Sequence, residues 1–484
     1  MFLNLITHIC YCRCYRILLY LQHLQGYMKQ QREHWGSKLG FIMATAGSAI
    51  GLGSLWRFPY IAGQNGGGAF VLLYLFFTLI IGIPVFIAEL IIGRTAQKGA
   101  IGAYNDLSHG STHWKLLGWF NLITSFIILS FYSVVSGWTV NYALMSLSNF
   151  TASRTPEEIK NVFSTLYVSG DINTFWLFFF VLITVGVVFG GIRKGIEYWS
   201  KILTPALLVI LVGLFIFSTT LPGFKEAVKF ILYPDFTKLN AGSVLAALGM
   251  ALFTLSVGLG IILTYGSYMK HTEDIPKTGL IIGGVSVSVS LLSALMIFPI
   301  VFTFGFEPQA GPGLVFQTLP VLFSKLPGTL ILSTIFFILF IFATLTSTIS
   351  ILEVLVSNLI EVFGWTRKKA AMLSGLAVFA FGIPTALSGS GTLFKNWKSI
   401  YGKDFFETMN DLTADWLMPI SAFFTVLFIS FVMKKAFSTE EFSKGTTLRK
   451  SMHVWFFLVR YVAPIAILII ILQQSGIINL GKLF

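Results

Sequence analysis

The sequence predicts an all-α polytopic membrane protein with about 11 transmembrane helices, and three observations support this prediction. Of its 484 residues, 55% are hydrophobic and only 11% are charged, whereas a soluble globular chain usually carries about 25% charged residues. The charged residues cluster between long apolar runs. Eleven such runs are present, and eleven helices of roughly 20 residues need about 220 residues of chain. This composition excludes a water-soluble enzyme.

The predicted spans follow one another with short loops between them. In chain order they are Leu39–Tyr60, Gly68–Ile92, Leu117–Ser146, Phe175–Phe189, Trp199–Phe217, Gly242–Tyr268, Gly279–Phe304, Gly328–Glu361, Ala370–Leu387, Met409–Met433 and Val454–Leu472. An odd number of spans would place the two ends of the chain on opposite sides of the membrane.

The distribution of charge predicts the orientation. The net charge is +13, but the basic residues lie in short loops between spans, where they set topology and do not indicate a nucleic-acid partner. With a cytoplasmic amino terminus, the loops that fall inside carry more Lys and Arg than those outside, as the positive-inside rule requires. We therefore expect a multi-pass protein of the cell inner (plasma) membrane, with its N-terminus cytoplasmic.

Residues 1–27 differ from the rest of the chain. Arg13 and Arg16 interrupt their apolar stretch and no small-residue cleavage site follows, so a signal peptide is not predicted. The spacing of the three cysteines is narrower than in most metal sites. We expect the body to begin at Met28 and residues 1–27 to be an N-terminal extension. The cysteines, all in this extension, are Cys10, Cys12 and Cys14.

The first and sixth predicted spans each contain a Gly-Leu-Gly triplet at mid-membrane depth, Gly51–Gly53 and Gly258–Gly260. Glycine is about 1 kcal/mol less favourable than alanine inside a helix, and unpaired backbone in lipid costs several kcal/mol more. Tight helix packing through small residues is one explanation. The matched positions in two five-helix halves favour another, a transporter site made of broken helices. There, free amides attract an anion and free carbonyls coordinate a cation.

Other motifs narrow the function. The chain has no Gly-x-x-x-x-Gly-Lys-Ser/Thr sequence, so an ATP-driven pump is not predicted. A chain that moves solute without ATP either draws on an ion gradient or conducts passively. Ionisable residues inside a span are costly and often functional. Those that stand out are Arg57, Glu89, Glu353 and Arg460.

Several ordered motifs carry a family resemblance that runs from Arg32 to the end of the chain. They are Arg32–Trp35, Gly47–Tyr60, Asn65–Phe70, Phe253–Ser256, Gly311–Phe316 and Leu345–Ser347. With them the sequence resembles the neurotransmitter:sodium symporters, and the bacterial amino-acid transporter branch in particular.

The resemblance implies a core of two inverted five-helix repeats, with helices 1 and 6 discontinuous. Residues 28–220 would form the first repeat (helices 1–5), and residues 221–437 the second (helices 6–10). Residues 438–484 would add helix 11 and a C-terminal tail.

The resemblance also implies a substrate site between the two breaks. Backbone groups there, with the hydroxyls of Tyr132 and Ser256, would hold the carboxylate and amine of an amino acid. Gly51 stands where monoamine members carry an aspartate, which favours an α-amino acid. The uncharged, mostly apolar lining implies a neutral, hydrophobic or aromatic side chain. The implied site residues are Ser48, Ala49, Gly51, Leu52, Gly53, Ile128, Tyr132, Phe253, Thr254, Ser256, Leu259, Ser347 and Ile351.

One or two sodium ions are implied as co-substrates. The second sodium site would use five neutral oxygens, from the carbonyls of Gly47, Ile50 and Ala343 and the hydroxyls of Thr346 and Ser347. In the first site two asparagines of the family pattern are serines here, so we expect a rearranged, weaker or lost site. Its residues would be Ala49, Ser54, Thr254 and Ser286.

Chloride dependence remains open at this stage. Chloride-dependent members have a serine where chloride-independent bacterial members carry a glutamate, and this chain has Ser290 there. Tyr74 and Thr254 match neighbouring positions, but a glutamine of that site is replaced by Met250.

The family pattern implies two gates. Outside, Arg57 would pair with Asp411, because the expected aspartate position is occupied by Asn410; one residue turns a helix by about 100°, so this pairing needs a shifted register. Inside, Arg32 would pair with Glu361. The residues of the implied aromatic lid are Tyr132 and Phe253.

Together these features predict a sodium-coupled secondary symporter that imports an amino acid by alternating access, as a monomer or weak homodimer. Two alternatives remain: an uncoupled conduit for amino acids or ions, and a transport-dead sensor that keeps the pocket.

Overall fold

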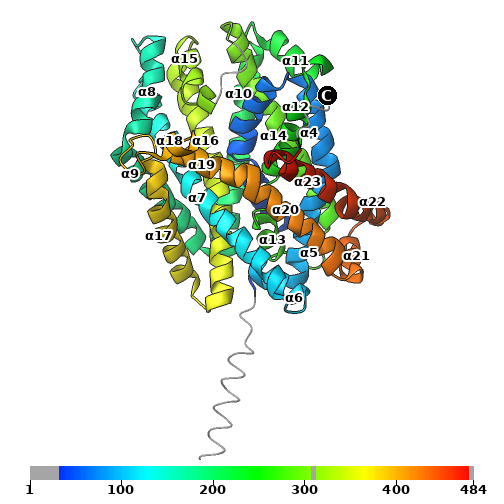
Figure 1. Ribbon diagram of the computed structural model, residues 1–484. Coiled ribbons are helices and arrows are strands. Elements are labelled where there is room, and N and C mark those ends of the chain that lie inside the picture. Colours follow the sequence, from blue (N-terminus) through cyan, green and yellow to red (C-terminus); the bar gives the residue numbers. More distant parts are fainter. Residues whose placement is uncertain (1–31, 307–311, 479–484) are drawn as a thin grey trace, which may run out of the picture. The chain divides into compact units, whose positions relative to one another are not determined.

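The computed structural model describes residues 32–306 and 312–478. The chain divides into two compact units, Met1–His34 and Trp35–Phe484, and every helix named below belongs to the second (Figure 1). The predicted extension 1–27, with its three cysteines, lies outside the described residues, as does Gly311.

Long apolar helices dominate the described part of the chain, which contains no β-strand. Nine helical segments there are long and apolar enough to cross a membrane, and a bent tenth is formed by Lys38–Ala49 and Gly53–Gln64. The all-α membrane class is thereby confirmed, while the count of eleven and the two inverted repeats remain predictions. The nine segments are Gly68–Ala96, Thr112–Leu147, Gly170–Phe189, Ile192–Thr219, Ile275–Thr303, Thr329–Phe363, Arg367–Ala386, Phe405–Val432 and Arg449–Gln474.

Several spans contain short π-helical stretches, labelled η, in which the backbone is locally wider than an α-helix. The bent segment comprises α2 (Lys38–Ala49), η1 (Gly53–Arg57) and α3 (Phe58–Gln64). The composite spans are α4 (Gly68–Phe77), η2 (Thr78–Gly82) and α5 (Ile83–Ala96); η3 (Ile192–Glu197) and α10 (Tyr198–Thr219); α19 (Phe405–Asp411), η6 (Leu412–Leu417), α20 (Met418–Leu427) and η7 (Phe428–Val432); and 3-10 turn η8 (Arg449–Ser451), α22 (Met452–Phe457), η9 (Leu458–Val462) and α23 (Ala463–Gln474).

The remaining spans are single α-helices, and shorter helices lie in the connections. The single spans are α7 (Thr112–Leu147), α9 (Gly170–Phe189), α14 (Ile275–Thr303), α16 (Thr329–Phe363) and α17 (Arg367–Ala386). The predicted sixth span is divided into α12 (Ala241–Thr254) and α13 (Ile261–Gly266). The connecting helices are α6 (Ala100–Leu107), α8 (Pro156–Val168), α11 (Phe224–Leu232), α15 (Thr318–Ser324), α18 (Trp397–Tyr401) and α21 (Lys435–Ser443), with 3-10 turns η4 (Phe236–Lys238) and η5 (Pro312–Leu314).

Local sequence explains where these helices begin and end. α16 starts after Gly328 and stops at Gly364, both in the left-handed conformation that glycine adopts without strain. α8 begins with a capping box between Thr155 and Glu158, which satisfies two backbone donors at the helix start.

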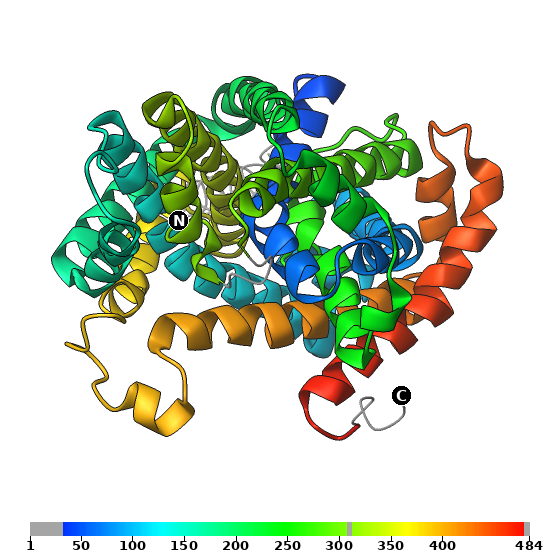
Figure 2. The same cartoon turned by 90° about the horizontal axis from the view of Figure 1, so that it is seen from above.

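The two longest helices, α7 and α16, pack along each other, and α16 also contacts α2 and α10. These contacts place α16 against the broken first span, with α7 packed on α16. The last helices, α21 to α23, lie at the outer edge of the helices, as Figure 2 shows in orange and red.

Candidate functional site

The first predicted span is interrupted at the glycine triplet. α2 ends at Ala49, and the helix axis bends by 48° between α2 and Gly53–Gln64. Ile50 has φ −88° and ψ 60°, which is outside the helical region, although its N–H still bonds to the Ala46 carbonyl at 2.8 Å. The last carbonyls of α2 therefore become available to side chains, because a helix cannot satisfy its own final carbonyls.

Hydroxyl groups from two other helical segments donate to these carbonyls. Thr346 Oγ1 donates to the Gly47 carbonyl at 2.9 Å, and the neighbouring Ser347 Oγ donates to the Ser48 carbonyl at 3.2 Å. Ser256 Oγ, from the second break, donates to the same Ser48 carbonyl at 3.2 Å. Two successive residues of α16 thus donate hydrogen bonds to two successive carbonyls of α2.

The second break, between α12 and α13, depends on residues in the left-handed region. Ser256, Gly258 and Gly260 have φ of 54°, 84° and 72°. A Cβ on Gly258 would lie 2.5 Å from the Met418 carbonyl oxygen, so both the backbone angle and the available space require glycine there.

Side chains from α5 and α7 satisfy the backbone of this second break. The buried Glu89 accepts the Gly258 N–H at 2.7 Å, and Ser125 Oγ donates to the Leu259 carbonyl at 2.6 Å. The sequence singled out Glu89 but not its partner. It did not single out Ser125, because one serine within a long apolar helix carries no distinguishing signal.

The predicted substrate-site residues come from α2, η1, α7, the second break and α16. Tyr132 provides the closest link between them, since its hydroxyl accepts the Leu52 N–H at 3.0 Å. A Cβ on Gly51 would lie 2.6 Å from Ser347 Oγ and 2.7 Å from the Tyr132 hydroxyl. Glycine at this position therefore permits a close approach of three elements.

The other residues of this predicted set lie in the same elements. Ala49 ends α2, and Gly53 begins η1 beside the ring of Phe253, which a Cβ would approach to 2.8 Å. Thr254 ends α12. Three further apolar members are at least nine-tenths buried: Ile128 of α7, Leu259 of the second break and Ile351 of α16.

The predicted second sodium site gathers neutral oxygens. Thr346 Oγ1 lies 2.9 Å from the Gly47 carbonyl oxygen and 3.0 Å from that of Ala343, and Ser347 is next in the chain. Ile50 lies at the bend itself and is fully buried. Hydroxyl and carbonyl oxygens suit a hard cation. Across the described residues, no group of His, Cys, Asp and Glu could hold a metal ion.

The two serines that replace the family's asparagines each meet an expected ligand of the first sodium site. Ser54 Oγ donates to the Ala49 carbonyl at 3.3 Å, and Ser286 Oγ donates to the Thr254 carbonyl at 3.1 Å. The expected ligands therefore meet in two pairs, and in each pair the serine hydroxyl donates to the carbonyl.

Three hydroxyls converge at the position predicted for chloride. The Tyr74 hydroxyl lies 3.1 Å from Thr254 Oγ1 and 3.2 Å from Ser290 Oγ. All three side chains are buried. Thr254 belongs to both this cluster and the first sodium set.

The outer ion pair differs from the prediction. Arg57 Nη2 lies 3.4 Å from Asp415 Oδ1, and its guanidinium lies 4.7 Å from the centroid of the Phe253 ring. Asp411 instead pairs with Lys403, so the predicted Arg57–Asp411 pair was wrong. Asp415 is one helical turn further along, inside the π-helical η6, and this wider turn changes which residues face η1.

The inner gate is only partly described. Glu361 accepts the Gly99 N–H at 2.8 and 3.0 Å. Arg32 belongs to the first unit, whose placement relative to Glu361 is not described, so their pairing remains a prediction. The Tyr132–Phe253 lid likewise remains a prediction.

Glu353, an ionisable residue that the sequence singled out in α16, has an ionic partner. Its carboxylate lies 2.5 Å from Arg367 Nη2 and accepts the Tyr268 hydroxyl at 2.6 Å. The buried charge is thus compensated within the protein, as a buried carboxylate requires.

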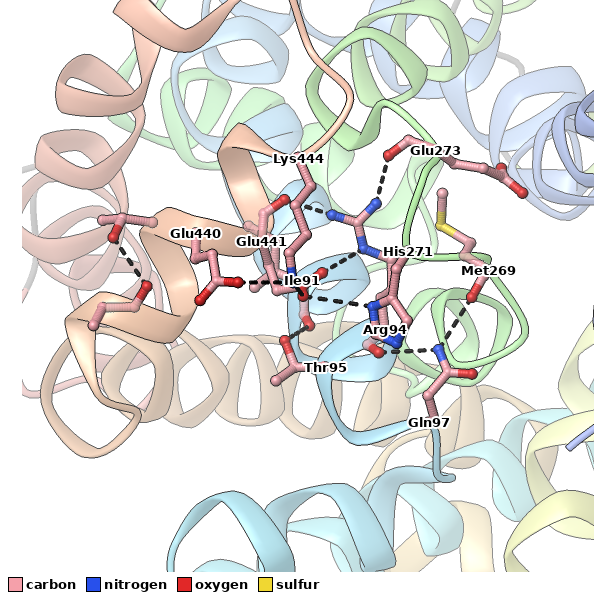
Figure 3. Close-up of polar contacts among 12 residues, drawn as sticks. Ile91, Arg94, Thr95, Gln97, Met269, His271, Glu273, Glu440, Glu441 and Lys444 are labelled. Carbon is pink, nitrogen blue, oxygen red and sulfur yellow. Dashed lines mark hydrogen bonds and ion pairs between the residues drawn. The ribbon is translucent and has the colours of Figure 1, made fainter. Parts of the chain in front are cut away.

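A second buried ion pair joins α5, the loop before α14, and α21 (Figure 3). Arg94 Nε lies 2.7 Å from Glu441 Oε2, and the other two guanidinium nitrogens donate to the backbone carbonyls of Glu273 and Glu441 at 2.5 Å. Lys444 lies 2.5 Å from the other carboxylate oxygen of Glu441, and His271 lies 3.5 Å from it. We call these residues the Arg94 cluster.

This arrangement can be compared with known proteins. The model of the sodium:neurotransmitter symporter family matches residues 32–161 and 156–481. The chain belongs to this family. It is 39% identical over 453 residues to the Bacillus subtilis protein named uncharacterized sodium-dependent transporter YhdH, covering 93% of this chain and 99% of that one. An uncharacterized sodium-dependent transporter of Haemophilus influenzae is 36% identical over 454 residues, covering 92% and 98%.

A solved structure also matches this family member closely. The crystal structure of MhsT in complex with L-phenylalanine superimposes with a TM-score of 0.84 at 38% identity, covering 91% of this chain and 99% of that one. The sodium-dependent serotonin transporter of Drosophila melanogaster is 28% identical over 423 residues, covering 77% and 67%. The chain is therefore a multi-pass secondary transporter of the sodium-dependent symporter family and not an enzyme.

Proposed function

We propose that this symporter couples sodium to the import of a neutral, hydrophobic or aromatic amino acid by alternating access. The observation that carries the proposal is the pairing of Thr346 and Ser347 with the carbonyls of Gly47 and Ser48. The first hydroxyl belongs to the proposed sodium site, and the second also to the proposed substrate site. One turn of α16 would therefore sense both ligands.

The chemistry around the breaks supports an amino-acid substrate. The Leu52 N–H and the Tyr132 hydroxyl form a donor group that suits a carboxylate, and the Ser48 carbonyl and Ser256 hydroxyl suit an ammonium group. Gly51 leaves no acidic side chain to replace the substrate's own carboxylate. The other residues of the proposed substrate site carry no charge. The amino acid bound in the MhsT structure is L-phenylalanine.

The ion sites support one or two sodium ions per cycle. The second site would bind sodium through neutral oxygens of Gly47, Ile50, Ala343, Thr346 and Ser347. The first site would bind more weakly, because serine reaches less far than asparagine. Chloride would sit among Tyr74, Thr254 and Ser290, and some relatives are named sodium- and chloride-dependent transporters.

The orientation and the arrangement of domains follow from the same proposal. The chain would lie in the plasma membrane with its N-terminus cytoplasmic. Residues 28–220 and 221–437 would form the two inverted repeats, and residues 438–484 would follow them. We propose a monomer or weak homodimer.

Uptake of radiolabelled L-phenylalanine into proteoliposomes tests the function. With an inward sodium gradient we expect accumulation above equilibrium, and without it none. Equal flux in both conditions would indicate the uncoupled conduit. Saturable binding without uptake would indicate the sensor.

A matched pair of variants tests the proposed sodium site. T346V removes the hydroxyl that meets the Gly47 carbonyl and should raise the half-saturating sodium concentration at least about tenfold, a loss of ~1.4 kcal/mol. T344V is the control, since the buried Thr344 hydroxyl bonds only within its own helix, to the Phe340 and Ile341 carbonyls. Equal effects of the two changes would reject the assignment.

A glycine pair tests the substrate site. G51A would place a methyl group against Ser347 and Tyr132, so binding of L-phenylalanine should weaken at least about tenfold. G249A is the control, because a Cβ at Gly249 of α12 meets nothing within 4 Å. Unchanged binding by G51A would place the substrate elsewhere.

A further inference from the structure

Arg460 is a charged residue inside a membrane span that the proposed transport function does not use. It lies in η9, and from Val454 to Arg460 the helix rises by about 9 Å. In the described part of the chain its guanidinium has no carboxylate partner, and its Nε is buried without a hydrogen-bond acceptor. An uncompensated arginine at this depth is costly, so a counter-charge should come from outside the described chain.

Aromatic rings surround this arginine. The guanidinium carbon lies 4.8 Å from the ring centroid of Phe431, 5.8 Å from that of Phe456 and 5.7 Å from that of Tyr461. Ring faces stabilise a cation, but they supply no acceptor for its N–H groups. The rings therefore hold the guanidinium in place and leave its hydrogen-bonding capacity unused.

A second cation shares one of these rings. Lys435 Nζ, at the start of α21, lies 5.1 Å from the Phe456 centroid. Lys434 Nζ lies 5.9 Å from the Phe437 centroid. Both lysines are exposed. Two positive charges on one ring repel each other unless an anion lies between them.

The acidic residues of α21 do not provide that anion. Glu440 pairs with Lys444 at 3.0 Å, and Glu441 pairs with both Lys444 and Arg94. Both carboxylates are therefore already neutralised by other cations. The group formed by Phe431, Lys435, Phe456, Arg460 and Tyr461, which we call the Arg460 cluster, carries an excess of positive charge.

The Arg460 cluster lies on the outer surface of the helices. Phe431 is 58% exposed and Tyr461 is 51% exposed, and Figure 2 shows α21 to α23 at the outer edge. Exposed aromatic residues next to basic ones are typical of the boundary between lipid headgroups and acyl chains. A long arginine side chain can reach that boundary from within the span.

We propose that the Arg460 cluster binds the headgroup of an anionic phospholipid. The phosphate would accept hydrogen bonds from the Arg460 guanidinium, whose planar fork suits phosphate oxygens. Lys435 and Lys434 would add charge that selects a lipid with net negative charge over a zwitterionic one. The exposed rings would contact the acyl chains. This surface is separate from the proposed transport site and does not depend on it.

Lipid binding to the purified full chain in neutral detergent tests this proposal. The probes are dioleoylphosphatidylglycerol and dioleoylphosphatidylcholine, which share acyl chains, with inorganic phosphate as a third arm. Native mass spectrometry counts retained lipid, and the lipid-induced rise in Tm gives the half-saturating concentration. We expect phosphatidylglycerol to be retained preferentially and to raise Tm, and phosphate alone to have no effect.

Three variants locate the site. R460Q should raise the half-saturating phosphatidylglycerol concentration about tenfold and K435Q about fivefold. K435Q is exposed and keeps the test valid if R460Q does not fold. K369Q is the matched control: it removes an exposed lysine that lies 5.0 Å from the Trp365 centroid, a ring on which the described residues place no second cation. Equal retention of the two lipids by the wild type would overturn the proposal. So would a K435Q variant that binds phosphatidylglycerol as tightly as the wild type, or K435Q and K369Q variants that lose the same affinity for it.

Discussion

Two arginine–carboxylate pairs in this molecule use the same chemistry in contrasting surroundings. Arg57 and Asp415 meet through one contact of 3.4 Å, and their side chains are 29% and 32% exposed. Arg94 and Glu441 meet at 2.7 Å with side chains 0% and 5% exposed, and Arg94 also donates to two backbone carbonyls.

The difference indicates which pair can separate during a transport cycle. An exposed ion pair contributes about 0–1 kcal/mol, so Arg57 and Asp415 can part at little cost. Breaking a buried pair by removing one partner costs about 3–5 kcal/mol. The Arg94 cluster therefore fixes α5, the loop before α14 and α21 to one another, whereas the Arg57 pair would separate in the proposed transport cycle.

The largest expected effect follows from removing the buried arginine. R94Q removes one of the two cations paired with the Glu441 carboxylate and leaves two backbone carbonyls without donors, so the free energy of unfolding should fall by about 3–5 kcal/mol. R57Q is the matched control and should lose less than about 1 kcal/mol. Thermal unfolding in detergent measures both, and similar losses would remove the contrast between the pairs.

Acid should reduce the stability that the Arg94–Glu441 pair contributes, but by less than the R94Q substitution does. Burial alone would raise the pKa of Glu441, but the hydrogen bond from Lys444 and the charge of Arg94 outweigh it and hold this pKa below its ordinary value of 4.5. The carboxylate therefore contributes stability above about pH 4.5, and this contribution is lost as pH falls through the lowered pKa.

The variant E441Q isolates this contribution. At pH 7 it should be about 2 kcal/mol less stable than the wild type, because charged hydrogen bonds are lost. The gap between the two unfolding curves should shrink as the pH falls below 4.5. A gap that stays constant down to pH 3 would argue against a titrating Glu441.

Removing the partly exposed carboxylate of Asp415 should affect transport more than stability. D415N should change the free energy of unfolding by less than about 1 kcal/mol. It should reduce the rate of sodium-driven L-phenylalanine uptake severalfold, because Arg57 would lose its partner above Phe253. A large loss of stability with normal uptake would assign Asp415 a structural role instead.

The smallest effect is expected for the ion pair of Asp411 and Lys403. Asp411 raises the pKa of Lys403 through a hydrogen bond at the surface, and both partners are at least partly exposed. D411N should alter stability by no more than about 0.5 kcal/mol and leave uptake unchanged. If D411N impaired uptake as strongly as D415N, Asp411 would be the functional partner of Arg57 after all.

The sequence predicted the membrane class and the two breaks because both depend on local composition. Span length follows from apolar runs, and the breaks are indicated by the glycines themselves, Gly51 and Gly258, because glycine is unfavourable inside a helix. The family resemblance, and not the triplets themselves, indicated which carbonyls would serve as ligands. The close approach of Gly51 to Tyr132 and Ser347 then agrees with the predicted meeting of three elements.

The ion pairs could not be predicted in the same way, because they depend on register and on distant contacts. Asp411 was predicted because it follows Asn410, the expected position; Asp415 was not singled out, and it lies in the π-helical η6, whose period differs from that of an α-helix. Arg94 and Glu441 are 347 residues apart. Nothing in the sequence near either residue indicates its partner.

The hydroxyls of Thr346 and Ser347 hold two peptide planes that pivot on one α-carbon, that of Ser48. In the proposed function, sodium would act on the first plane through the Gly47 carbonyl, and the second plane carries the Ser48 carbonyl of the proposed substrate site. If the two sites are coupled, thermodynamic linkage requires that sodium and the amino acid each raise the affinity for the other by the same factor. The affinity for sodium would be measured with and without saturating amino acid, and the affinity for the amino acid with and without saturating sodium. The two affinities would have to change by the same factor.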